Sequence, residues 1–142
     1  MAVTARPGNA RGPGAGARFS ERYPAVARSP AQARAGVVAF AREHGAAQGA
    51  TAAIALAVSE AVTNVVVHAY RDAPAAGIVQ VTAELASGKL LVTVSDRGAG
   101  LREASARPGL GLGLAIIAQS AENMDLARTR GGGIELRMRF AL

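Results

Sequence analysis

Three stretches of the chain repeat apolar residues at three- and four-residue spacing, and each of them predicts an amphipathic helix. The first begins at Ser29, read as the N-cap before a proline at the first helical position, and ends at Gly45. The second covers Thr51–Ala69, where burial is expected to keep three consecutive valines helical in spite of their strand preference. The third covers Leu112–Asn123. The chain therefore carries three helices, two of them before the first clear strand pattern.

Alternating apolar and polar residues predict the strands of a half-covered sheet. Turn signals separate them, at Ser87-Gly88-Lys89 and at the triple glycine 131–133. The predicted strands are Phe19–Val26 (a strand or an extended entry segment), Ile78–Leu85, Leu90–Ser95, Met124–Thr129 and Ile134–Phe140. Hairpins between sequence neighbours favour an α+β fold, a two-layer sandwich with a mostly antiparallel, mixed sheet and helices on one face.

Length and composition narrow the class of protein. At 142 residues, the chain fits one domain, which we place at residues 18–142 after a flexible tail over residues 1–17 that is rich in Gly, Pro, Ala and Arg. No apolar run reaches the roughly 18 residues of a membrane helix, and no apolar leader segment stands near the start, so a cytoplasmic protein without membrane contact is expected. The absence of cysteine excludes disulfides, thiolate catalysis and cysteine-based metal sites.

The net charge of +6 suggests an anionic partner. Fifteen of the sixteen basic residues are arginines, however, and they are scattered along an alanine-rich chain, as codon bias in a GC-rich genome would produce. Aromatic residues make up only 4% of the chain, which leaves little for stacking on bases. No direct binding to nucleic acid is therefore expected.

The first polar cluster lies in the second predicted helix. Glu60, Asn64 and His68 follow one another at four-residue steps, so an α-helix places them on one stripe. A carboxylate and an amide among apolar neighbours are costly unless something engages them, and a divalent cation is one candidate. The alternative is a solvated helix face without a ligand.

The second cluster follows the strand Leu90–Ser95. Asp96 stands at the end of this apolar strand, and Gly98 and Gly100 allow the backbone to turn closely around whatever the carboxylate binds. A buried carboxylate can accept a hydrogen bond from an exocyclic amine such as that of adenine. An ordinary Asp-x-Gly turn is the alternative.

The third cluster opens the last predicted helix. Gly109, Gly111 and Gly113 lead directly into it, and backbone amides at a helix N-terminus can bind phosphate where glycines permit close approach. The spacing is neither the dinucleotide fingerprint nor the P-loop, so this cluster alone identifies no ligand.

Taken in order, the three clusters resemble the N, G1 and G2 boxes of the GHKL ATPases, whose ATP site is the Bergerat fold. The resemblance covers about residues 18–142. Within that superfamily, the phrase AVSEAVTNVVVHAY and the short distance between the glycine boxes look like the anti-sigma factor serine/threonine-protein kinases of bacteria.

The resemblance implies ATP or ADP and Mg²⁺ as ligands, and it implies a role for each box. Glu60 falls where the family has the general base, Asn64 where it has the Mg²⁺ ligand, and Asp96 where it has the carboxylate that reads the adenine amino group. The implied nucleotide-contacting glycines are Gly98 and Gly100 beside adenine, and Gly109, Gly111 and Gly113 beside the phosphates.

The implied activity is that of an ATP-dependent protein serine/threonine kinase. Such a protein sequesters a sigma factor and phosphorylates an anti-anti-sigma partner on serine, and by analogy it forms a homodimer through the sheet and the first helix. The alternative is a non-catalytic, nucleotide-gated interaction module of the same fold.

Two departures from the family pattern bear on the site. Gly133-Ile134 stands where many relatives have Gly-Thr, so a hydroxyl contact to Asp96 is expected to be missing. Only LREASARP separates Gly100 from Gly109, too short for a long lid, which implies fast nucleotide exchange and modest affinity. For His68 we expect packing against the Tyr70 segment, and for Arg97 a solvated loop position or a contact to a phosphate or an acidic partner.

Overall fold

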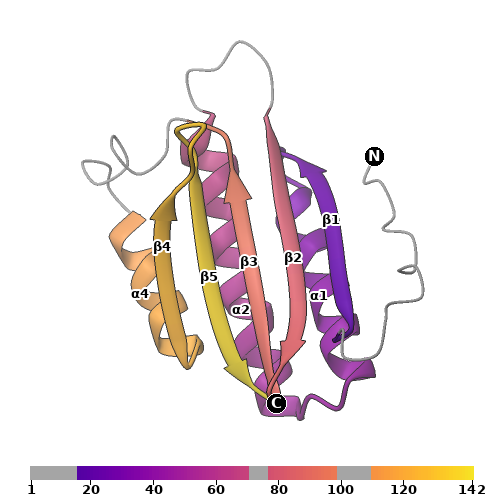
Figure 1. The fold of residues 1–142 in the computed structure, drawn as a ribbon. Coiled ribbons are helices and arrows are strands. Elements are labelled where there is room, and N and C mark those ends of the chain that lie inside the picture. Colours follow the sequence, from indigo (N-terminus) through magenta and orange to yellow (C-terminus); the bar gives the residue numbers. More distant parts are fainter. Residues whose placement is uncertain (1–15, 71–76, 99–109) are drawn as a thin grey trace.

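The computed structural model describes residues 16–70, 77–98 and 110–142. The sites predicted at Gly100 and Gly109, most of the predicted tail and the predicted short lid lie outside these residues. The helices and strands, shown in Figure 1, are β1 (Arg18–Pro24), α1 (Ser29–Glu43), α2 (Gln48–Asn64), the π-helix η1 (Val65–Ala69), β2 (Ile78–Ala86), β3 (Lys89–Asp96), α4 (Leu110–Ser120), β4 (Asn123–Arg128) and β5 (Ile134–Ala141).

The strands form one sheet in the order β1-β2-β3-β5-β4. Every pairing between these strands is antiparallel, although the sequence pattern left room for a mixed sheet. Register follows the alternation predicted from sequence: Val81, Val94 and Leu136 lie side by side across β2, β3 and β5, and all three are buried. A shift of one residue would turn this apolar row toward solvent, so burial specifies the register.

The helices cover one face of the sheet, and the other face is left open (Figure 1). This arrangement confirms the predicted α+β two-layer sandwich. The middle helix, α2, packs between α1 and α4, and it buries Ile54, Val58 and Val62 in the core. Gln48–Ala69 is long and apolar enough to cross a membrane by length and composition. Its place as the core helix of the sandwich explains that hydropathy.

The predicted N-cap at Ser29 is wrong. Arg28 already has helical dihedral angles, φ −78° and ψ −17°, and occupies the N-cap position without a side-chain hydrogen bond to the helix. Ser29 is therefore the first residue inside α1, where its buried hydroxyl donates to the backbone carbonyl of Pro24. The serine ties the end of β1 to the start of α1, and the proline stands in the first turn at the second helical position instead of the predicted first.

The consecutive valines after Asn64 are helical, as predicted, but their turn is a π-helix over Val65–Ala69. A π-turn pairs residues five apart, so the four-residue stripe deduced for an α-helix does not continue through it. His68, half-buried in this turn, is therefore not aligned with Glu60 and Asn64 in the way that its spacing suggests.

Candidate functional site

The polar residues of α2 face the start of α4. Glu60 and Asn64 are half-buried, and a methyl group placed on Gly113 would lie 3.2 Å from both Asn64 side-chain amide atoms and 3.4 Å from Glu60 Oε2. Gly113 stands in the first turn of α4, together with Gly111. The fold thus brings the first and third predicted clusters into contact, and the missing side chain at Gly113 leaves a small polar cradle between the two helices.

The donor set of this cradle suits one type of metal. Glu60 supplies a carboxylate and Asn64 an amide carbonyl, both hard oxygen ligands of the kind that Mg²⁺ prefers. Among the described residues, no three His, Cys, Asp or Glu side chains gather as a metal cage. Mg²⁺ usually keeps several waters and takes one or two protein ligands together with substrate phosphates.

Asp96 ends β3 on the covered face of the sheet, opposite Val79, and is only 6% exposed. The Gly98 backbone N–H donates to Asp96 Oδ1 at 2.8 Å, and the Ile134 backbone N–H also donates to this carboxylate. Burial raises the pKa of Asp96 above its usual range, and the two amide hydrogen bonds oppose that rise without cancelling it. Although Ile134 has no hydroxyl, its backbone amide supports the aspartate.

Two glycines allow the backbone to close around Asp96. A methyl group on Gly98 would overlap the carbonyl oxygen of Ala69, at the end of the π-helix. One on Gly133 would overlap the carbonyl oxygen of Asp96 itself. Gly98, expected from sequence to make room for a ligand, also makes room for the helix end. Gly133 was read only as a turn residue, because a triple glycine does not show which member is packed.

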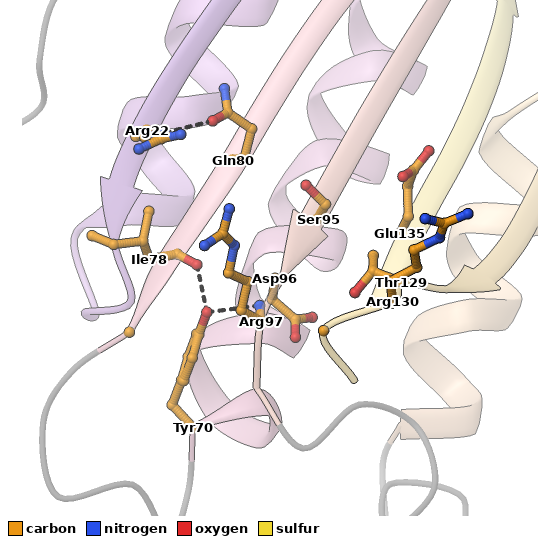
Figure 2. Close-up of a pocket in the computed structure, with 12 residues that line it drawn as sticks. Arg22, Tyr70, Ile78, Gln80, Ser95, Asp96, Arg97, Thr129, Arg130 and Glu135 are labelled. Carbon is orange, nitrogen blue, oxygen red and sulfur yellow. Dashed lines mark hydrogen bonds between the residues drawn. The ribbon is translucent and has the colours of Figure 1, made fainter. Parts of the chain in front are cut away.

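Tyr70 is a further site residue that the sequence did not single out. Its hydroxyl donates to the Ile78 carbonyl oxygen at 2.6 Å and accepts from the Arg97 backbone N–H at 2.9 Å, as the dashed lines of Figure 2 show. Its ring lies over Gly77, where any side chain would collide with it. The tyrosine joins the start of β2 to the residue that follows β3, beside Asp96.

All these residues meet at one end of the sandwich. The C-terminal ends of η1 and β3 lie at the upper edge of the sheet in Figure 1, and α4 begins on the same side. One end therefore joins a Glu–Asn pair on a core helix, a buried aspartate at a strand end and a glycine-rich helix start.

This combination of fold and site defines a nucleotide-binding domain of the histidine kinase-like ATPase type. The family model described as "Histidine kinase-like ATPase domain" matches residues 23–140. The chain belongs to this family, in the branch of the anti-sigma kinases.

Relatives of similar length are anti-sigma F factors. The chain is 28% identical to that of Pasteuria penetrans, covering 85% of this chain and 88% of the relative. It is 31% identical to that of Caldanaerobacter subterraneus, with 75% and 80% covered. The serine-protein kinase RsbW of Staphylococcus aureus is 33% identical over 57% of this chain and 48% of its own.

Solved structures agree with this placement. The RsbU and RsbW domains of Rv1364c from Mycobacterium tuberculosis superpose with a TM-score of 0.70 at 25% identity, over 88% of this chain. This chain spans about a third (32%) of that one. The histidine kinase domain of the blue-light-activated kinase EL346 from Erythrobacter litoralis gives a TM-score of 0.57 at 25% identity, covering 80% of this chain and 60% of its own.

Proposed function

We propose that this protein binds Mg-ATP and acts as an anti-sigma factor with serine/threonine protein kinase activity. The observation that carries the proposal is the contact of Glu60 and Asn64 with the glycine-rich start of α4, at the end of the sheet where Asp96 is buried. The anti-sigma F factors and RsbW among its relatives support the same function.

In this proposal Asp96 accepts a hydrogen bond from the adenine amino group. The buried carboxylate already takes two backbone N–H bonds, which orient it and leave acceptor capacity for a further donor. Gly98 and Gly100 shape the adenine side of the site, and Gly109, Gly111 and Gly113 the phosphate side, where helix amides meet negative charge.

Asn64 would hold Mg²⁺ through its amide oxygen, and the ion would neutralise charge on the phosphates. Glu60 lies one helical turn earlier and faces the same cradle, so it is placed to take the proton from the hydroxyl of an acceptor serine. The hydroxyl oxygen then attacks the γ-phosphorus, and ADP leaves. The protein contributes mainly position and electrostatic stabilisation to this transfer.

The proposed partners are a sigma factor, which the protein sequesters, and an anti-anti-sigma protein, which it phosphorylates on serine. The proposed location is the cytoplasm, and a homodimer is the proposed assembly. Direct contact with nucleic acid is not part of the proposal.

The test separates nucleotide binding from phosphate transfer. Glu60→Ala is expected to keep ATP affinity but to lower transfer to an anti-anti-sigma partner encoded beside the gene by about 10²–10⁴-fold, the usual size of a general-base contribution. Asn64→Ala is expected to weaken Mg-ATP binding itself, because it removes a metal ligand. Glu43→Ala, which removes a carboxylate from the exposed end of α1, is the charge-matched control and is expected to change neither.

Titration calorimetry with Mg-ATP and radiolabelled phosphate transfer measure the two quantities. Transfer at the wild-type rate by Glu60→Ala would show that the base is assigned wrongly. A wild-type protein that binds ATP but transfers nothing to such a partner would be a nucleotide-gated interaction module instead of a kinase.

A further inference from the structure

A cleft of about 700 Å³ opens on the side of the sheet that the helices leave uncovered. Its floor is a row of four side chains in register, contributed by β1, β2, β3 and β5. Two arginines that follow β3 and β4 complete the walls (Figure 2). The floor residues are Arg22, Gln80, Ser95 and Glu135, the wall residues are Arg97 and Arg130, and the buried Asp96 lines the cleft at the β3 end.

Some charged side chains of this cleft have an ionic partner, and others do not. Glu135 is held by Arg137, whose Nε lies 2.6 Å from Glu135 Oε1, and Arg22 donates to the side-chain oxygen of Gln80 at 2.8 Å. Arg97 and Arg130 are exposed, and neither guanidinium forms an ion pair with a described residue. The cleft thus presents two free guanidinium groups beside a third that has only a neutral partner.

Carboxylates suit this cleft better than a nucleic-acid backbone does. A guanidinium binds a carboxylate through two parallel hydrogen bonds, and Ser95 adds a hydroxyl for a peptide. The Gln80 side-chain amide is already bonded to Arg22, Ser20 and Glu21. Tyr70 is the one aromatic residue among the described residues of the lining, so the cleft lacks the series of rings on which successive bases stack.

A second copy of the chain is a poor occupant. It carries the same net charge of +6, and no two of its ten acidic residues are adjacent in sequence. A segment with several acidic side chains must therefore come from another protein.

We propose that this cleft docks an acidic segment of a protein partner, with Arg97 and Arg130 as its main carboxylate contacts. The volume of about 700 Å³ lies in the range of about 300–1,000 Å³ that is typical of ligand-binding clefts. Asp96 also lines the cleft, so the segment would lie directly beside the proposed adenine site. The docking site does not depend on the catalytic assignment of Glu60 or Asn64.

Fluorescence anisotropy with a labelled octaglutamate peptide tests the site on the full chain. The double variant Arg97→Ser/Arg130→Ser is expected to bind the peptide about 2- to 30-fold more weakly than wild type, the combined effect of two exposed ion pairs. The control Arg28→Ser/Arg42→Ser removes the same charge from exposed positions at the two ends of α1. It is expected to lower affinity less than about twofold at 150 mM salt, where distant charges are screened.

Three outcomes would overturn the proposal. Equal weakening in both double variants would mean that only net charge matters, and no peptide binding by wild type would mean that the cleft takes no acidic segment. Tighter binding of an eight-nucleotide oligothymidylate, lost in Arg97→Ser/Arg130→Ser but not in the control, would assign the cleft to nucleic acid. Unchanged thermal midpoints for both variants exclude misfolding, and unchanged Mg-ATP affinity keeps the result separate from the proposed kinase function.

Discussion

Replacing Tyr70 by phenylalanine tests how the fold positions Asp96. The β2–β3 ladder ends at the pair Val79 and Asp96, and the next pair outward would be Ile78 and Arg97. At this outward pair the Tyr70 hydroxyl bridges the two strands, because it donates to the Ile78 carbonyl and accepts from the Arg97 amide. The substitution removes only this oxygen and leaves the ring that covers Gly77.

The size of the effect follows from the two hydrogen bonds. Each is worth about 0.5–1.5 kcal/mol net, and the site is partly open to water, which can replace the lost partner. We therefore expect a loss of about 1 kcal/mol, or roughly 3–5 °C in thermal midpoint for a domain of this size.

The functional consequence is a change in base discrimination. Without the two hydrogen bonds of the Tyr70 hydroxyl, the C-terminal end of β3 holds the Asp96 carboxylate less firmly against an adenine amino group. We expect ATP affinity to fall about 3- to 10-fold, less than the loss of a whole charge-assisted hydrogen bond, because the bond is weakened and not removed. ITP, which has a carbonyl in place of that amine, is expected to bind as weakly as before. Calorimetric titration with both nucleotides gives the ATP/ITP ratio.

Tyr23→Phe is the matched control. Tyr23 is buried, and its hydroxyl donates to the Glu21 carboxylate at 2.8 Å, toward α1 and away from the β3 end. Its loss is expected to lower stability without changing the ATP/ITP ratio. If Tyr70→Phe lowers the melting temperature and leaves that ratio at the wild-type value, Tyr70 is a structural residue only and the positioning argument is refuted.

Three further predictions follow from single contacts. Because the folded-state pKa of Asp96 is raised, wild type should lose stability relative to Asp96→Asn as pH rises through that pKa. A difference in melting temperature between the two proteins that stays constant from about pH 3.5 to 7.5 would contradict this prediction. Gly113→Ala should raise the stability of the protein by up to about 1 kcal/mol through helix propensity, yet weaken Mg-ATP binding, since its methyl group would press on the Asn64 amide. Unchanged Mg-ATP affinity would show that the cradle between Gly113, Glu60 and Asn64 is not part of the nucleotide site. Gly133→Ala should cost several kcal/mol or prevent folding, whereas Gly131→Ala, with open space around it, should shift the melting temperature by no more than about 2 °C.

Much of the fold is predictable from sequence because it depends on periodic burial. The alternation of Val79, Val81 and Ala83 specifies one covered face, and the spacing of Ile54 and Val58 specifies the buried side of α2. These patterns repeat over several residues, so a single misread position does not change the element. The Asp96, Gly98 and Gly113 positions of the site were likewise found from local motifs.

What sequence reasoning missed depends on contacts between distant segments. Ser29 has the residue type and spacing of an N-cap, but the helical conformation of Arg28 moves the cap one residue earlier. The packing of Gly133 on Asp96 and the hydrogen bond from the Arg97 amide to Tyr70 join residues 27 or more positions apart, and no local pattern signals either. The π-turn ends at Ala69, whose carbonyl Gly98 approaches closely, another contact between distant segments.

The buried aspartate connects the stability of this end of the molecule with its proposed ligand. Burial makes the ionised form of Asp96 costly, as its raised pKa shows, and two backbone amides offset only part of that cost. A bound amino group would supply a further donor to a carboxylate that the fold has already oriented, so little reorganisation is needed on binding. The residues that orient it, Gly133 and Tyr70, contact the backbone of the β3 end instead of the ligand. Selectivity for adenine should therefore be lost by substitutions on both sides of Asp96, including ones that remove no group in contact with the nucleotide.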